Sequence, residues 1–224
     1  MNYTKMYEAL IKVLEKDEQI TFAMTDITSR QIELWSLMFK DRSPWINENV
    51  ESLGLPAAIS GELARLVTLE LESKITGGAR ATFLNSHYQT QVSKLKEPVE
   101  FACAKGGLIF KPYVTEQGLA TQIVQADSFF PITFDDSGNI TRICFVEQYR
   151  KANDIYTRVE YHKLENGRLA VKNRIFKSAT EGILGSEVSL QSVDKWSHLA
   201  EEMTIENVSK IPIGYFKVPV ANNK

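Results

Sequence analysis

Residues 140–177 decide the fold, and they read ITRICFVEQYR (140–150), KAN (151–153), DIYTRVEYHK (154–163), LENG (164–167) and RLAVKNRIFK (168–177). In each of the three long runs, apolar and polar side chains alternate with a period of two, as in a strand with one buried face. The two short runs between them hold residues that suit tight turns. Three consecutive strands joined by tight turns predict an antiparallel meander.

The same alternation continues upstream as far as Gly107. Three further strands are predicted there: LIFKPYV (108–114), LATQIVQA (119–126) and FFPITF (129–134). The connections TEQG and DDSGN again have turn chemistry, so we expect one continuous meander over residues 107–177. Residues 178–224 form a loop-rich segment that we expect to pack on the same domain. Within it the sequence predicts a short strand at 187–193, a short helix at 193–203 and a last strand at 213–220.

The first 106 residues show the 3.6-residue period of amphipathic helices, so residues 1–106 are predicted to form a helical region. Four helices are expected, within residues 3–16, 26–41, 55–76 and 85–105. Pro56 suits a first helical turn, whereas Pro98 predicts a kink or break inside the fourth helix. The glycine pairs 77–78 and 106–107 are expected to end the third and fourth helices.

Polar side chains at the predicted helix starts can accept a hydrogen bond from the first turn. Thr28 or Ser29 is expected to cap the second helix, and Asn85 the fourth. Each helix also carries an apolar stripe at helical spacing, and in the third helix the stripe consists of Ile59, Leu63, Leu66 and Val67. We expect these stripes to be core.

The fold class that follows is α+β, with the N-terminal helices packed on one face of the antiparallel meander. The residues assigned to the buried face are Ile143, Phe145, Tyr149, Ile155, Val159, Tyr161, Leu169, Val171 and Ile175. The positions between them form a wet face, which includes Arg142, Arg158, Lys172 and Arg174. Residues 140–177 carry nine basic and four acidic side chains, so this face is mildly basic.

Composition excludes few classes of protein. The 224 residues carry 26 basic and 28 acidic side chains, and a net charge of −2 gives no overall attraction to nucleic acid. Cys103 and Cys144 lie in apolar surroundings, where two buried thiols in a reducing compartment are favoured over one disulfide. The N-terminal residues lack the apolar core of a signal peptide, and no run is long enough to cross a membrane.

Asp135 and Asp136, adjacent in DDSGN, are the most visible pair of carboxylates. A turn explains them better than catalysis, because adjacent residues at a turn tip point into water. His87, His162 and His198 are isolated in sequence, and the spacings of zinc sites, phosphate-binding loops and nucleophile elbows do not occur. We therefore predict no catalytic, cofactor-binding or metal-binding residue, no cofactor, and a protein that is not an enzyme.

Several stretches, taken in order, resemble the portal proteins of tailed bacteriophages that infect Gram-positive hosts. They are IELWSLMFKDRSPW (32–45), LPAAISGELARLVTLELES (55–73), FACAKGGLIFKPYV (101–114), VQADSFFPITFDDSGNITRICFVEQ (124–148), YTRVEYHKLENGRLAVKNRIFKS (156–178) and TIENVSKIPIGYFKVPVANN (204–223). No single stretch is a chemical motif, and the specificity of the resemblance lies in the ordered set. Related proteins are also called minor capsid or head–tail connector proteins.

The resemblance implies a structural virion protein that forms a ring, commonly of twelve subunits, at one vertex of the capsid. Such a ring passes DNA during packaging and ejection, while a separate terminase hydrolyses ATP. The implied partners are other portal subunits, capsid and terminase proteins, and phage DNA, with no membrane. The implied location is the virion, or the bacterial cytoplasm when the protein is expressed from a prophage. Helices followed by a meander match the peripheral wing of a portal subunit.

Members of that family continue beyond VPVANN into a stem, clip and crown. We therefore expect this chain to be a wing portion, either a piece of a longer protein or a shortened prophage remnant. It should fold without the stem and remain a monomer or weak oligomer rather than a closed ring. Tyr215 and Phe216 are expected to be partly uncovered. Two alternatives stay open: a binding module whose basic sheet face (Arg142, Arg158, Lys172 and Arg174) grips an acidic partner or nucleic acid, and an enzyme with an unrecognised pocket.

Overall fold

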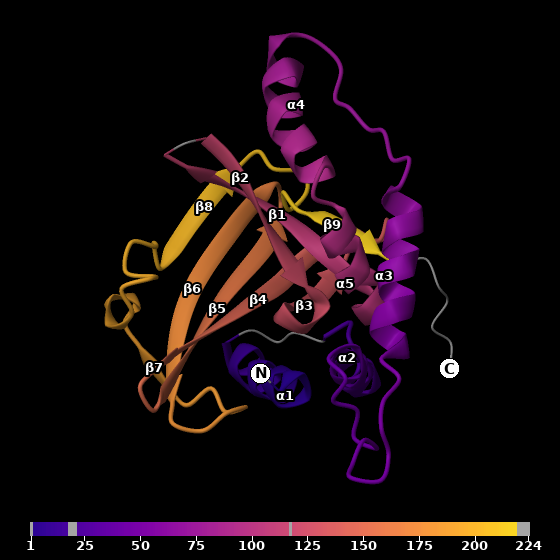
Figure 1. The fold of residues 1–224 in the computed structure, drawn as a ribbon. Helices are drawn as coiled ribbons and strands as arrows, with labels where there is room; N and C mark the ends of the chain where they lie inside the picture. The colour runs from indigo at the N-terminus through magenta and orange to yellow at the C-terminus, as the bar shows by residue number, and fades with distance from the viewer. Residues whose placement is uncertain (1, 18–21, 117, 219–224) are drawn as a thin grey trace. The chain divides into compact units, whose positions relative to one another are not determined.

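The computed structural model describes residues 2–17, 22–116 and 118–218 (Figure 1). The chain forms two compact units, the first made of residues 1–33 and 127–211 and the second of residues 34–126 and 212–224. Helix α2 (Asp26–Phe39) crosses from the first unit to the second. The predicted α+β class is confirmed, and an antiparallel meander is present, although it begins at Phe129 rather than at Gly107.

The first unit is built on a six-stranded antiparallel sheet. Its strands are β3 (Phe129–Phe134), β4 (Ile140–Lys151), β5 (Asp154–Glu165), β6 (Arg168–Ser178), β7 (Ser186–Val188) and β8 (Glu202–Glu206). The order is β3-β4-β5-β6-β7, and β8 pairs with a different part of β6. Asn166 and Gly167 both have positive φ in the turn between β5 and β6, the conformation that a two-residue hairpin turn needs.

Helix α1 (Tyr3–Asp17) packs on one face of this sheet. Its stripe of Tyr3, Met6, Tyr7, Leu10 and Leu14 is buried. The Tyr3 ring stacks on Phe130 with 4.4 Å between ring centroids, and its hydroxyl donates a hydrogen bond to the Phe129 carbonyl oxygen at 2.9 Å. The prediction that an N-terminal helix covers the meander is confirmed for α1.

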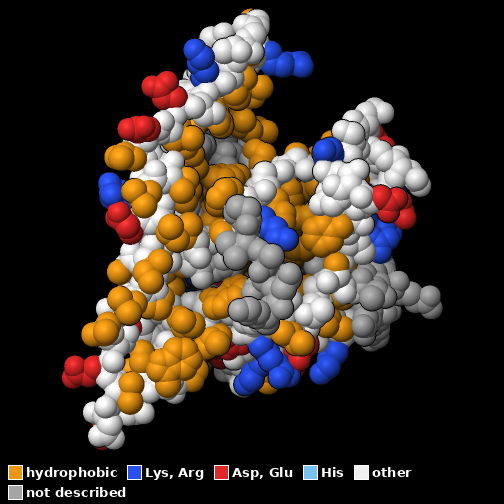
Figure 2. All heavy atoms as spheres, turned by 90° about the vertical axis from the view of Figure 1, so that its right-hand side faces the viewer, with side chains coloured by type: hydrophobic (Ala, Val, Ile, Leu, Met, Phe, Trp, Pro, Cys, Tyr) orange, Lys and Arg blue, Asp and Glu red, His pale blue; other side chains and the backbone are white. Residues whose placement is uncertain are grey.

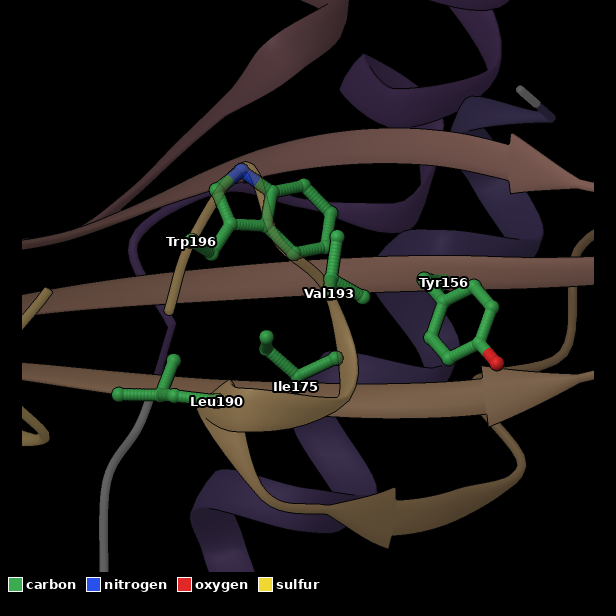
Figure 3. Close-up of a cluster of buried hydrophobic side chains, with 5 residues drawn as sticks. All are labelled: Tyr156, Ile175, Leu190, Val193 and Trp196. Atoms are coloured by element: carbon green, nitrogen blue, oxygen red, sulfur yellow. The ribbon is translucent and has the colours of Figure 1, made fainter. Parts of the chain in front are cut away.

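The opposite face of β5 and β6 is covered by residues 190–199, which begin with the short helix η2 (Leu190–Ser192). Figure 3 shows Leu190, Val193 and Trp196 lying over Ile175 and Tyr156. Trp196 is only 2% exposed and is the largest fully buried side chain among the described residues. The sheet therefore has apolar cover on both faces, which differs from the single wet face that the sequence predicts.

The second unit combines three helices with a three-stranded antiparallel sheet. The helices are α3 (Leu55–Thr68), α4 (Ala79–Val92) and α5 (Lys96–Lys105). The strands are β1 (Gly107–Thr115), β2 (Gly118–Gln125) and β9 (Gly214–Lys217), in the order β2-β1-β9. Gly106 ends α5 with φ 90°, as the predicted glycine stop requires.

All six predicted strands over residues 107–177 exist, but the single meander does not. After β2 the chain makes a short 3₁₀ turn, η1 (Ala126–Ser128), instead of a tight hairpin turn. Strand β2 does not pair with β3, and β1 pairs with β2 on one side and with the closing strand β9 on the other. The C-terminal segment is divided accordingly, since β7 and β8 join the meander and β9 joins the other sheet.

Several predicted boundaries are wrong. Helix α3 ends at Thr68 rather than near the glycine pair 77–78, and α4 starts at Ala79. Asn85 therefore lies inside α4, where its side chain accepts a hydrogen bond from the Ile75 amide. Thr25, not Thr28 or Ser29, accepts the hydrogen bond at the start of α2.

Other boundary predictions have mixed outcomes. The helix predicted at 193–203 is absent, because those described residues form turns that lead into β8. Pro98 follows a break between α4 and α5, as predicted. Gln117 of the TEQG turn and residues 219–224 of the closing stretch lie outside the described residues.

Candidate functional site: an exposed apolar helix face

Helix α3 packs on α5 through small side chains. Ser60 and Ala64 are buried, and a Cβ atom added to Gly61 would lie 3.7 Å from the Glu100 carboxyl carbon of α5. The start of the helix suits its sequence, since Gly54 has φ 63° and Pro56 occupies the first turn. Small residues allow the two helices to approach closely, so the large side chains of α3 point elsewhere.

The large apolar side chains of α3 are exposed. We call the set Leu55, Ile59, Leu63, Leu66 and Val67 the α3 face, and each member is 46–57% exposed. This set contains the whole stripe that the sequence predicts to be core, so that prediction is wrong. Figure 2 views the side of the molecule that carries α3 and shows hydrophobic side chains gathered along it.

Exposed apolar side chains continue beyond both ends of α3. Leu53 precedes the helix and is 84% exposed, and the residues that follow in the connection and in α4 are Leu69, Leu71, Ile75, Phe83 and Leu84. Helix α4 buries none of its residues. Monomeric soluble proteins seldom expose contiguous apolar patches larger than roughly 300–600 Å². A surface of this kind is typical of a protein–protein interface.

The connection between α3 and α4 has a defined path despite this exposure. The Ser73 and Tyr88 hydroxyls are hydrogen bonded at 2.6 Å, and Gln89 donates to the Ser73 carbonyl oxygen. These bonds, with that of Asn85, hold residues 73–75 along α4. The apolar side chains of the connection are therefore carried on an ordered segment.

A polar cluster on the sheet of the first unit is the second candidate. Glu147 accepts hydrogen bonds from Trp196 Nε1 and Arg158 Nη2, each at 3.2 Å, and also from Lys195. The other Arg158 terminal nitrogen lies 3.0 Å from Glu160, which is hydrogen bonded to His162 at 2.6 Å. These contacts tie the segment that carries Trp196 to strands β4 and β5.

The arrangement of this cluster points to structure rather than chemistry. Burial raises the pKa of Glu147, but the Lys195 hydrogen bond and the charges of Arg158 and Lys195 outweigh it, so the pKa is lowered and the carboxyl stays ionised. Arg158 Nε and His162 Nδ1 are buried without a hydrogen-bond partner among the described residues. The desolvation of buried charges offsets much of their attraction, so such ion pairs are weak evidence of added stability.

Asp135 and Asp136 form the predicted turn. Asp135 Oδ1 accepts hydrogen bonds from the backbone amides of Ser137 and Asn139 at 2.9 and 2.8 Å. Hydrogen bonds from the Asn139 side chain, together with these backbone bonds, lower the pKa of Asp135. Both carboxylates are exposed. The structural interpretation of this pair is confirmed.

The histidines and cysteines do not converge on a site. His87 packs edge-on against Phe83 in α4, and His162 belongs to the polar cluster. Cys103 and Cys144 are free thiols, and burial raises the pKa of each. Among the described residues, no group of three or more His, Cys, Asp or Glu side chains could hold a metal ion.

The predicted basic sheet face is wrong in its geometry. Cross-strand pairing aligns Arg158 with Glu147 and Ile175, whereas Lys172 aligns with Tyr161 and therefore lies on the opposite face. Arg142 and Arg174 share the face of Lys172.

Each of the four basic side chains also faces a carboxylate. Arg174 pairs with Glu187 at 2.6 Å, Lys172 lies 3.7 Å from Glu202, and Arg142 lies 3.9 Å from Glu165. Arg158 lies in the polar cluster. The four cations thus form no common surface, because the register places one of them opposite to the other three.

The expectation for the closing stretch holds in part. Tyr215 in β9 is 39% exposed and Phe216 is half-buried.

No described helix has the length and apolar character that a membrane crossing requires. A scan against models of protein families finds no match for this sequence, and a search of curated proteins finds none either.

Proposed function

We propose that the chain is a structural assembly subunit, the wing portion of a bacteriophage portal protein. The single observation that carries the proposal is the apolar surface formed by the α3 face and its continuation toward α4. Burying such a surface is the main driving force of protein association. A protein that presents it on an ordered helix is built to contact other proteins.

The ordered set of portal-like stretches supports the same proposal. The stretch at residues 55–73, which resembles the first core helix of the family, contains all five residues of the α3 face. In this proposal the side chains of the α3 face, which lie within the portal-like stretch, contact a neighbouring protein. The proposed role is structural and not enzymatic, in the virion or in the bacterial cytoplasm when expressed from a prophage.

The proposed partners are those of a portal assembly: further portal subunits, capsid and terminase proteins, and packaged DNA. The basic-face alternative has no supporting observation of its own. Its four cations are divided between two faces and each faces a carboxylate, so they do not present a common phosphate-binding surface.

Quantitative mass spectrometry of purified phage particles tests the proposal. Peptides of this sequence should be present in the particle at the low copy number of a single-vertex ring, far below that of the major shell protein. Finding the sequence at the copy number of a shell protein, or finding it absent from particles, would contradict the proposal. The genes beside it supply a second check, since terminase and head-protease genes should lie nearby.

A further inference from the structure

We propose that the α3 face binds the α3 face of a second copy of this chain, as an antiparallel pair of helices related by a two-fold axis. This contact goes beyond the portal proposal. A closed ring of more than two subunits joins two different surfaces of neighbouring copies, whereas a two-fold contact joins one surface to itself and stops at two copies. Four features of α3 support a second copy of the chain as the binding partner.

The first feature is the size of the surface. Eight large apolar residues between positions 53 and 71 are 42–84% exposed: Leu53, Leu55, Ile59, Leu63, Leu66, Val67, Leu69 and Leu71. Their exposed area sums to on the order of 800 Å², which is what each partner contributes to an interface of standard size. Five of the eight residues belong to the α3 face itself, so pairing of two α3 faces would give an interface in the lower part of the range of interface sizes.

The second feature is the spacing of the side chains. Leu55, Ile59, Leu63 and Val67 recur every four residues, so they form one continuous ridge of the helix. The ridge is symmetric about position 61. In an antiparallel copy, Leu55 would lie opposite Val67 of the partner subunit and Ile59 opposite Leu63 of the partner subunit. Each large side chain then meets another large apolar side chain.

The third feature is charge. The charged side chains within α3 are Glu62 and Arg65, and they pair with each other at 2.7 Å. Within the helix itself no net charge repels a second copy, and the exposed Glu70 and Glu72 lie beyond its end, in the connection to α4. The charges beside the apolar ridge cancel each other, so the ridge can pack against the same ridge of a second copy.

The fourth feature is that the other side of α3 is already occupied. Ser60 and Ala64 are buried, and Gly61 lies close to α5, so this side has no further packing to make. The large side chains of the α3 face keep about half of their surface exposed. That exposed part is available for an intermolecular contact, and substitutions there leave the small-residue contact with α5 in place.

Sedimentation velocity over a wide range of chain concentrations tests the proposal. The unmodified chain should shift from monomer to dimer as its concentration rises. Leu63→Glu should raise the dimer dissociation constant by about a hundredfold or more, since it places a charge at the centre of the interface. The matched control is Val114→Glu, which changes another exposed apolar residue, 84% exposed in β1 of the same unit, and should leave the dimer intact.

Thiol cross-linking tests the antiparallel geometry. In a Cys103→Ser background, Ile59→Cys and Leu63→Cys chains are prepared separately and treated with a short thiol cross-linker, alone and mixed. The antiparallel pair predicts that the mixture links more efficiently than either chain alone. Preferential linking of each chain to itself would indicate a parallel pair and overturn the proposed geometry.

The remaining outcomes are also decisive. Circular dichroism first establishes that each variant is folded. A chain that stays monomeric at every concentration, or a dimer that persists in Leu63→Glu, would overturn the α3 pairing while leaving the portal proposal to its test on particles. A homogeneous closed ring of many subunits would overturn the two-fold pairing and would favour the ring. A dimer together with absence from phage particles would uphold the pairing and refute the portal proposal.

Discussion

Replacing Trp196 by alanine should strongly destabilise the first unit. The indole is 2% exposed and packs with Tyr156, Ile175, Leu190 and Val193, and its Nε1 donates to Glu147 at 3.2 Å. Truncation of a buried tryptophan typically costs about 3–5 kcal/mol, because it removes apolar contacts and leaves a cavity. Domains are usually stable by only about 5–15 kcal/mol. The substitution should therefore remove from about a fifth to all of the stability of this unit.

Urea denaturation followed by far-ultraviolet circular dichroism measures the effect. Trp196→Phe separates the two contributions, since phenylalanine keeps an aromatic ring in the cluster but cannot donate to Glu147. We expect Trp196→Phe to cost about 2 kcal/mol, in the range of a hydrogen bond to a charged group. The matched control is Trp45→Ala, in the second unit, where the side chain is 53% exposed and the change should therefore cost clearly less than Trp196→Ala.

Two results would refute this reasoning. A loss below about 1 kcal/mol in Trp196→Ala would mean that residues 190–199 are not packed on the sheet as the buried cluster requires. An equal loss in Trp196→Phe and Trp196→Ala would assign the whole effect to the Glu147 hydrogen bond and none to apolar packing. Both comparisons depend on an unchanged urea m-value, which shows that the surface exposed on unfolding is the same.

Two further substitutions test the polar contacts of the first unit. The pKa of Glu147 is lowered from its ordinary 4.5, so its stabilising contribution is present above that value and is lost as the pH falls through the lowered pKa. The stability difference between the unmodified chain and Glu147→Gln, measured by urea titration at several pH values, should therefore be largest near neutral pH and shrink in acid. A difference that grows in acid would contradict the assigned contacts with Arg158 and Lys195. Asp135→Ala should lower the melting temperature measured by circular dichroism, because the turn loses the carboxylate that accepts hydrogen bonds from its backbone amides. The control Asp136→Ala should have little effect. Equal effects of the two substitutions would refute the role of Asp135 in the turn.

The strands could be predicted from the sequence because alternation and turn chemistry agree there. Asn166 and Gly167 supply the two positive φ values that a tight turn needs, and the flanking runs have matching lengths. The assignment of faces could not be predicted in the same way. In β5 both faces are buried, so Val159 and Glu160 are 4% and 8% exposed although they point in opposite directions. A one-residue difference in register moves every side chain to the other face, and alternation alone does not fix that register.

The division into two sheets depends on contacts between distant parts of the chain. The sequence shows a strand at β1 and another at β9, but nothing local to either of them specifies that they pair. The close approach at Gly107 explains part of the choice, since a Cβ atom there would lie 2.7 Å from the Phe216 carbonyl oxygen. Glycine is thus required where β9 pairs with the start of β1. The double glycine at 106–107 predicts a helix stop. Its second role, the close approach of β9 at Gly107, is visible only in the three-dimensional structure.

Helix α3 shows why the candidate site was missed. A helix with one apolar stripe has one natural buried face, but α3 has two faces that could pack: a ridge of large residues and, on another side, the small residues Ser60, Gly61 and Ala64. Sequence reasoning assigns the large residues to the core because burying them gains more free energy. The chain instead uses the small residues for α5, where close approach matters, and leaves the large ridge outside. The ridge therefore stays available for contact with another protein surface, and this exposure is the basis of the proposed pairing.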